Sequence, residues 1–479
     1  MPLLSRRRFG TSLQFPAQVG LWLFGMLGVG VLASLILTGQ VRAAVAFTTL
    51  VGLVTLAMIQ LRLAILAALV FLVLLGDLRR LLIPVADWSG TDPLLVVGPA
   101  FALITTGYTL ASGRFSFDTP AAKWMLGLMA IMVIQIFNPR QGGLLVGVVA
   151  IMFQLVPLLW FWLGRVYGTR ALLQTLLFRV MLGLSALAML FGLYQTVFGY
   201  LPYQMEWFYT AGYTALGSLE TGLSPITFFA SGTEHNVFVN LGLILLWTLV
   251  LFGRRWAALL IPVFFGALLL TGTRGPIAKG LVMMAGLWAL LGPSLKSWVL
   301  RGALALTIAA GGLYLGLSAL HQTLDDAPRP VQAQLDRQVA EFVHGSGSHQ
   351  GSSAANHLGM LVYGYQTGFE RPLGHGLSAG TKAAKKFGSL STTETDLGDS
   401  FLALGVPGGV AYHGLVIVLI VTAFRLWQRN RDPLSMALLG FMGIAFFGWL
   451  SGGRYAVTPL LWFCLGGLDR LWKNESPSE

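Results

Sequence analysis

The chain has 479 residues, of which 55% are hydrophobic and only 10% are charged, and its formal net charge is +12. A soluble domain carries about 25% charged residues because its surface faces water. This composition excludes a soluble globular protein and indicates a chain whose surface lies mostly in lipid. The single cysteine, Cys464, also excludes an internal disulfide and a cysteine metal cluster.

The N-terminal region predicts an uncleaved first span. Arg6, Arg7 and Arg8 precede an apolar run at 19–38. That run is longer than the apolar core of a signal peptide, which has roughly 7–15 residues. We therefore expect the N-terminus to lie in the cytoplasm.

Hydropathy predicts an all-α, polytopic bundle. A helix that crosses a bilayer needs about 20 mostly apolar residues. Fourteen segments approach this length, and the short region 43–76 decides between 12 and 14 spans. The segments are 19–38, 43–60, 62–76, 93–111, 122–137, 142–163, 172–198, 235–252, 256–272, 276–292, 298–319, 400–424, 434–450 and 455–471.

The spans divide the chain into three parts. Residues 1–319 hold helices 1–11, and residues 320–399 form a long extracytoplasmic loop with short helices. Residues 400–479 hold helices 12–14 and a cytoplasmic tail. Within the loop, 330–343 has apolar residues at helical spacing, and 345–353 (GSGSHQGSS) has the composition of a flexible linker.

Charge alternates between the loops as the positive-inside rule requires. The loop at 199–234, after the seventh span, contains no Lys or Arg. One loop breaks the pattern because it holds Arg79 and Arg80. The basic residues of the even-numbered loops include Arg62, Arg114, Lys123, Arg165, Arg170, Arg254, Arg255, Lys296, Arg301, Arg425, Arg429 and Arg431. We therefore expect both termini in the cytoplasm, and 199–234 and 320–399 outside it.

Several ionisable residues collect on the predicted outer side. Arginines there would hold phosphate oxygens at two points, and a carboxylate or histidine would take a proton from a hydroxyl. Together they predict a site for an anionic, lipid-linked substrate. The candidates are Arg274, Arg371, His235 and Arg454 for binding, and Asp399, Glu394 and His375 for catalysis.

Each candidate has a structural alternative. Arg274 and Arg454 could equally be anchors whose charged ends reach the membrane surface. His235, like His413 within a span, would equally serve as a hydrogen-bond partner of a neighbouring helix. The acids near 394–399 would equally form a solvated loop edge. The histidines in the Gly/Ser tract are interpreted as residues of a solvated loop rather than as metal ligands.

Four motifs in order resemble the family of O-antigen ligases and O-antigen or exopolysaccharide polymerases. A TGTRG turn lies at Thr271–Gly275, and a Pro-Leu-Gly-x-Gly element lies at Pro372–Gly376. A polar–aromatic–Leu stretch at Asp399–Leu402 precedes a Gly-x-x-Gly-Gly element at Gly405–Gly409. The resemblance covers about 235–425, and the N-terminal half resembles the family only in hydropathy.

The resemblance implies a bacterial inner-membrane glycosyltransferase whose active site faces the periplasm. It would transfer a glycan from undecaprenyl pyrophosphate to a sugar hydroxyl, without metal, cofactor or nucleic acid. Arg274 would then bind the pyrophosphate. Membrane lipids, a chain-length regulator and a flippase would be its partners.

Two departures favour a polymerase over a ligase. The chain has no basic residue from Tyr200 to Phe252 other than His235, where ligases typically show an arginine. It also has Asp399 or nearby acids where ligases show a histidine. A transporter of a small anion or of a lipid-linked saccharide is the main alternative, and an envelope scaffold is a third. Transporters tend to place charges near the bilayer midplane, whereas the charges here collect at one face.

Overall fold

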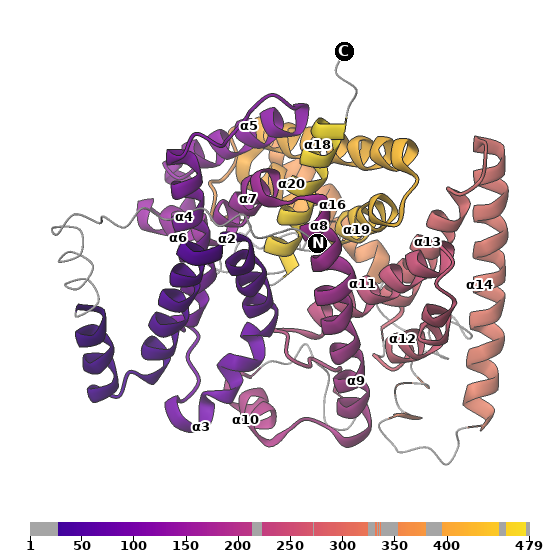
Figure 1. Cartoon of the computed structure of the whole chain (residues 1–479), viewed down its shortest axis with the longest axis horizontal. Helices are drawn as coiled ribbons and strands as arrows, with labels where there is room; N and C mark the ends of the chain where they lie inside the picture. Colours follow the sequence, from indigo (N-terminus) through magenta and orange to yellow (C-terminus); the bar gives the residue numbers. More distant parts are fainter. Residues whose placement is uncertain are drawn as a thin grey trace, which may run out of the picture.

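The computed structural model describes residues 27–212, 223–271, 273–323, four residues of 331–336, 353–379, 395–449 and 457–475. The structure is 83% helical, and the described residues contain no strand. The predicted all-α fold is therefore confirmed (Figure 1).

The helices follow the chain from an N-terminal helix at Leu27–Leu37 to a C-terminal helix at Val457–Glu475. Short 3₁₀ segments occur at Pro139–Gln141, Val156–Leu158 and Arg255–Leu259, and a π-helical turn lies at Leu176–Met181. The labelled helices are α2 (Val41–Leu81), α3 (Ile83–Ala86), α4 (Leu94–Ala111), α5 (Pro120–Gln135), α6 (Leu144–Gln154), α7 (Leu159–Tyr167), α8 (Arg170–Thr175), α9 (Leu182–Phe198), α10 (Pro202–Ala211), α11 (Gly232–Leu251), α12 (Ile261–Leu269), α13 (Arg274–Ala289), α14 (Leu295–Thr323), α16 (Ser353–Glu370), α18 (Asp396–Asn430), α19 (Pro433–Trp449) and α20 (Val457–Glu475).

The chain is a multi-pass membrane protein. Among the described residues, seven helical stretches are long and apolar enough to cross a bilayer, and four shorter helices are also apolar. In the described part of the chain, each of the fourteen apolar segments predicted from the sequence overlaps one or more helices. The total of 12–14 complete crossings stays a prediction.

The disputed region 43–76 contains two helices joined at a sharp break. Gln60, inside α2, has φ −150° and ψ 86°, which is not helical. A straight helix of 41 residues would be about 60 Å long. However, the Arg42 guanidinium at its start donates to the Arg79 carbonyl near its end, at 3.1 Å. The two halves therefore fold back on each other as an antiparallel pair.

The odd-numbered loops that the structure describes meet at one end of the bundle, here called the odd end. Four contacts within this end join segments that are far apart in the sequence. The start of α2 meets the segment between α3 and α4, and α10 meets the end of α2. The segment before α11 meets the segment after α12, and the segment after α5 meets the segment after α16. The four contacts are Arg42 with Asp92 (2.5 Å), Tyr203 with Asp77 (3.0 Å), Ser224 with the Thr271 carbonyl (3.4 Å) and Asn138 with the Gly374 carbonyl (3.2 Å).

The even-numbered loops and the C-terminal helix meet at another end. Lys473 lies 2.5 Å from Asp118, and its hydrogen bond lowers the pKa of that carboxyl to about 2. Arg165 pairs with Asp118 and with Asp469, and Arg170 pairs with Asp432 at 2.6 Å. These contacts agree with the predicted alternation of the chain between two sides.

Arg79 and Arg80 break the charge pattern because they serve in packing. Arg80 is buried, lies 3.7 Å from the Asp77 carboxylate, and donates to the Phe229 carbonyl. Arg79 pairs with Asp92 at 3.1 Å. Arg80 ties the third loop to 199–234, and Arg79 shares Asp92 with Arg42 at the start of α2, which explains why both stand on the side with few basic residues.

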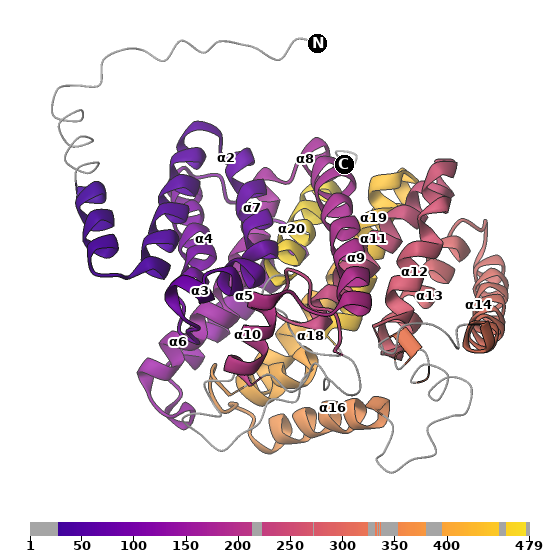
Figure 2. The ribbon, with the colours of Figure 1, turned by 90° about the horizontal axis from the view of Figure 1, so that it is seen from below.

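Helix α16 lies across the odd end of the bundle and packs on α18 (Figure 2). Since α14 ends at Thr323 and α18 begins at Asp396, the segment between them is slightly shorter than the predicted 320–399. The predicted helix at 330–343 falls almost entirely outside the described residues, and the linker at 345–353 falls outside them except for Ser353, the first residue of α16.

The sidedness of the two ends is open to a labelling experiment. Tyr209 on α10 is 64% exposed at the odd end, and Ser112, after α4, is exposed at the other end. The native Cys464 is buried. We predict that an impermeant maleimide labels Tyr209→Cys in spheroplasts and labels Ser112→Cys only after lysis. The reverse pattern would overturn the topology and the outer position of the site.

Candidate functional site

A row of buried polar side chains opens helix α11. The Ser231 hydroxyl caps the helix by accepting from the Glu234 N–H at 3.3 Å. Glu234, His235, Asn236 and Asn240 follow, each no more than 8% exposed. Polar groups at membrane depth are energetically unfavourable, so these residues are candidates for a functional site.

Two of these residues face helix α13 and form a polar seam, here called the α11–α13 seam. The Asn236 amide donates to the Thr273 hydroxyl at 3.3 Å, and Thr273 is exposed at the odd end. One turn deeper, the Asn240 amide donates to the Pro276 carbonyl at 3.1 Å. The side-chain carbonyl oxygens of both asparagines are buried and have no partner in the described part of the chain. The seam thus offers two free acceptors.

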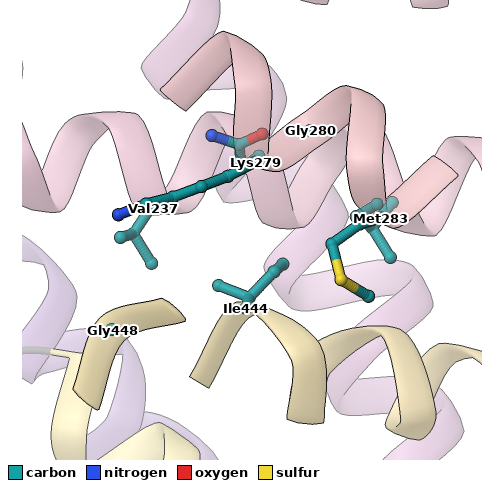
Figure 3. A pocket seen from close by; sticks show the side chains of 8 residues that line it. Val237, Lys279, Gly280, Met283, Ile444 and Gly448 are labelled. Carbon is teal, nitrogen blue, oxygen red and sulfur yellow. The ribbon is translucent and has the colours of Figure 1, made fainter. Parts of the chain in front are cut away.

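A small pocket lies at the deep end of the seam, between α11, α13 and α19. Its volume is about 20 Å³, enough for one water molecule. Asn240 and Lys279 supply its polar lining. Figure 3 shows the Lys279 side chain extended across the pocket toward Val237, with Ile444 of α19 on the opposite wall.

His235 faces a different neighbour. Its Nδ1 lies 3.4 Å from the Thr227 hydroxyl, and its ring packs against Gly192 of α9, where an added methyl group would lie 2.6 Å from the ring. It is fully buried. His235 thus packs against α9, while the polar partner of its ring lies in the segment before α11 rather than on a neighbouring helix.

The Pro-Leu-Gly-x-Gly element docks against a break in α18. Gly405, inside α18, has φ +68° and ψ −167°, a conformation that is essentially restricted to glycine. The Pro372 carbonyl accepts from the Val406 N–H at 3.0 Å, and the Gly376 N–H donates to the Ala403 carbonyl at 3.0 Å. Two motifs that lie about thirty residues apart in the sequence therefore form one junction, here called the α16–α18 junction.

This junction orients His375. The ring Nδ1 lies 3.1 Å from the Leu402 carbonyl, which can only accept. In the neutral ring, Nδ1 therefore carries the proton and Nε2 has the lone pair. Arg371, at the end of α16, is exposed. His413 accepts from the Tyr365 hydroxyl at 3.0 Å, which agrees with the predicted interhelical hydrogen bond.

Asp399 lies in the first turn of α18, at the same junction. The Thr395 hydroxyl caps this helix by accepting from the Gly398 N–H at 3.1 Å. Asp396 and Asp399 are both half-buried, and both act electrostatically on the hydroxyl of Tyr412. These acids are therefore more enclosed than residues of a solvated loop edge.

The predicted site residues occupy two regions. Arg274 is the first residue of α13, at the seam, and its side chain lies outside the described residues, as do Glu394 and Arg454. Asp399 and His375 belong to the α16–α18 junction. Helix α19 packs on both α13 and α18, and the pocket of the seam does not include Asp399. No three His, Cys, Asp or Glu side chains in the described part come together to hold a metal ion.

Comparison with known proteins assigns the chain to no family. No protein-family model matches the chain, and no curated protein matches it. Its function must therefore be argued from its own residues.

Sequence reasoning missed Lys279 and Asn240. Both lie inside segments that hydropathy assigns to the membrane, at 276–292 and 235–252. The available signal was their polarity itself, because an ionisable or amide side chain within a span is a functional candidate.

The Gly405 break yields a stability prediction. A methyl group at Gly405 would meet the Pro372 carbonyl and would force alanine into a glycine conformation, at a cost of about 1–3 kcal/mol. We expect Gly405→Ala to lower the unfolding temperature of the detergent-solubilised protein. Gly286→Ala in α13 is the matched control, since nothing lies within 4 Å of an added methyl there. Equal unfolding temperatures for the two variants would contradict the docking described above.

Proposed function

We propose that this chain is a membrane glycosyltransferase that polymerises, or ligates, glycan units carried on undecaprenyl pyrophosphate. The reaction would take place on the periplasmic side and would build a surface polysaccharide or exopolysaccharide. The observation that carries the proposal is the α11–α13 seam. Its buried, unpartnered amide oxygens lie next to the exposed Thr273 and one turn deeper, and Lys279 lines the pocket at the deep end.

The start of α13 supports a donor site for a glycan pyrophosphate. The free amide oxygens of the seam only accept hydrogen bonds, so they fit hydroxyl groups of the glycan rather than its phosphates. In the proposed reaction an acceptor hydroxyl attacks the anomeric carbon of the donor sugar. The bond between that carbon and the pyrophosphate oxygen breaks, and the lipid pyrophosphate leaves with the bonding electrons. Arg274, at the start of α13, would stabilise the leaving group, because a guanidinium holds phosphate oxygens at two points.

An apolar groove beside the seam supports binding of the lipid tail. It lies between α12, α13 and α14 and has a volume of about 340 Å³. Leu281 and Met284 of α13 line this groove, whereas Lys279 and Met283 of the same helix line the polar pocket. Helix α13 thus carries one lysine on the side of the small pocket and apolar side chains on the side of the groove, an arrangement that suits an amphiphilic substrate.

The α16–α18 junction supports an acceptor side. Asp399 is our first choice for the base that takes the proton of the attacking hydroxyl, with Glu394 in reserve. His375 is the third choice, because its Nε2 carries the lone pair. Arg371 and Arg454 would hold anionic groups of the substrate, and the exposed odd end would meet a chain-length regulator or a flippase.

One observation favours the alternative of a transporter. A lysine in a pocket inside the bundle, together with the helix break at Gly405, is also typical of transport proteins. The purified protein in liposomes separates the two functions. Elongation of a lipid-linked oligosaccharide supports the transferase, whereas saccharide or anion flux without elongation supports the transporter.

The donor site is tested by changing Arg274. Arg274→Lys keeps the charge but loses the two-point fork, so transfer should fall about tenfold or more. The rate of transfer should fall further in Arg274→Ala, which also loses the charge. The measurement is the rate of elongation of a lipid-linked oligosaccharide by purified protein, with Arg254→Lys at the even end as control. Wild-type rates for both Arg274 variants would make Arg274 a membrane anchor.

The base is tested by a pair of variants within one helical turn. General-base catalysis is typically worth about 10²–10⁴-fold, so Asp399→Asn should slow elongation by at least about 100-fold. Asp396→Asn, in the same turn, is the matched control and should keep most of the rate. Binding of the lipid-linked donor should change little in either variant. Normal elongation by Asp399→Asn would exclude this residue as the base.

A further inference from the structure

The even end of the bundle carries two groups of basic residues that differ in their partners. Arg165, Arg170 and Lys473 each pair with a carboxylate. A second group lies at the ends of α11, α13, α14 and α18, and none of its members has a carboxylate partner in the described part of the chain. The sequence explains this, because it has no Asp or Glu at 235–324 or at 400–431. The second group consists of Arg254, Arg255, Lys296, Arg301, Arg425 and Arg431.

Contacts between aromatic rings and a backbone carbonyl bring these four helix ends together. They are Phe252 with Trp427 (6.2 Å between ring centroids), Trp298 with Phe424 (5.7 Å) and the Arg431 guanidinium with the Leu290 carbonyl (3.0 Å). The six basic residues therefore share one surface at the even end, here called the basic face.

Tryptophan rings hold two of the guanidinium groups in place. The guanidinium carbon of Arg301 lies 5.7 Å from the Trp288 ring centroid, and that of Arg431 lies 5.0 Å from the Trp427 ring centroid. Trp288 and Leu290 both lie at the end of α13, so both arginines lie there too. In the described part of the chain, Arg431 donates to one oxygen and Arg301 donates to none. Most of their N–H donors are therefore available to an anion.

The surroundings of the basic face place it at the level of lipid headgroups. Helix α14 lies at the edge of the structure, and 0% of its most apolar stretch is buried inside the bundle (Figure 1). Exposed apolar side chains lie near the charges, among them Trp256, Leu295 and Val299. Tryptophan and basic residues at the ends of spans are typical of the boundary between membrane and water. A soluble acidic partner would not need this apolar surface.

We propose that the basic face binds the headgroups of anionic phospholipids in the leaflet at the even end. The charge pattern predicts that this leaflet is the cytoplasmic one. Arg301 and Arg431 each hold phosphodiester oxygens at two points, and Lys296 and Arg425 add charge. Clusters of four to eight basic residues beside a span attract such lipids, and each residue contributes about fivefold in affinity. The proposal does not depend on the reaction that the chain catalyses.

Selectivity between two lipids tests the proposal. Purified full-length protein in detergent is titrated with dansyl-labelled phosphatidylglycerol, which is anionic, and with dansyl-labelled phosphatidylcholine, which is zwitterionic. Energy transfer from tryptophan reports binding. The wild type should bind phosphatidylglycerol about tenfold or more tightly than phosphatidylcholine, and high salt should reduce the preference.

Two pairs of substitutions in the basic face are compared with a control pair. Arg301→Gln/Arg431→Gln and Lys296→Gln/Arg425→Gln each remove two charges, so each should weaken binding of phosphatidylglycerol about 10- to 30-fold. Binding of phosphatidylcholine should not change. The control, Arg114→Gln/Lys123→Gln, removes two exposed charges from another part of the even end and should bind as the wild type does.

Unfolding temperature separates lipid binding from a role in folding. The side chains of Lys296 and Arg425 are exposed and make no hydrogen bond or ion pair in the described part of the chain. Lys296→Gln/Arg425→Gln should therefore unfold at the wild-type temperature in detergent without added lipid. A lower temperature would assign these charges to folding and would count against the proposal.

The other outcomes separate the lipid from other anions. Equal affinity of the wild type for the two lipids would overturn the proposal, and so would equal losses in the basic-face pairs and the control pair. Glycerophosphoglycerol (the soluble headgroup) and polyglutamate serve as competitors. If the soluble headgroup competes as well as the lipid itself, the surface binds a soluble phosphate instead. If polyglutamate does so, and competes less well in Lys296→Gln/Arg425→Gln, the surface docks an acidic protein and the lipid proposal is wrong.

Discussion

The cost of an unsatisfied polar group in hydrocarbon governs this structure. Lipid offers no hydrogen bonds, so each buried charge must find a partner within the protein or a function with a ligand. Arg80 and Arg165 find partners within the protein, since each pairs with a carboxylate and donates to further oxygens. The side-chain oxygens of Asn236 and Asn240 have no such partner, since no described group donates to them. Buried polar atoms without a partner also occur elsewhere in the described part, for example Arg80 Nε and Gln141 Oε1, and the α11–α13 seam differs in holding two such acceptors one helical turn apart.

The sequence predicted the helices well because hydropathy is a local property. It also predicted which loops lie at the same end of the bundle, because the positive-inside rule acts on each loop separately. Arg79 and Arg80 could not be understood in this way. Their partners, such as Asp92 and Phe229, come from other parts of the chain and are known only once the chain has folded. The turn at Gln60 was left open for a related reason, since no glycine or proline marks it.

The candidate site was predictable in its parts rather than in its arrangement. Motif order correctly drew attention to Pro372–Gly376 and Gly405–Gly409, and the structure joins them through the Pro372 carbonyl and the Val406 N–H. The sequence placed Arg274 and Asp399 in one cluster. The structure instead assigns them to two regions, both in contact with α19. Lys279 escaped notice because a single polar residue barely changes the mean hydropathy of a span.

Direct mapping of the bound donor tests the central claim, which is that the lipid-linked donor binds at the α11–α13 seam. A polyprenyl pyrophosphate analogue with a photoreactive diazirine beside its phosphates would be cross-linked to the protein in liposomes, and the labelled peptides would be identified by mass spectrometry. We expect labels within 231–240 and 273–283, and competition by unlabelled polyprenyl pyrophosphate should remove them. Labels confined to the end that holds Arg165 and Lys473, or labels that competition does not remove, would contradict the claim.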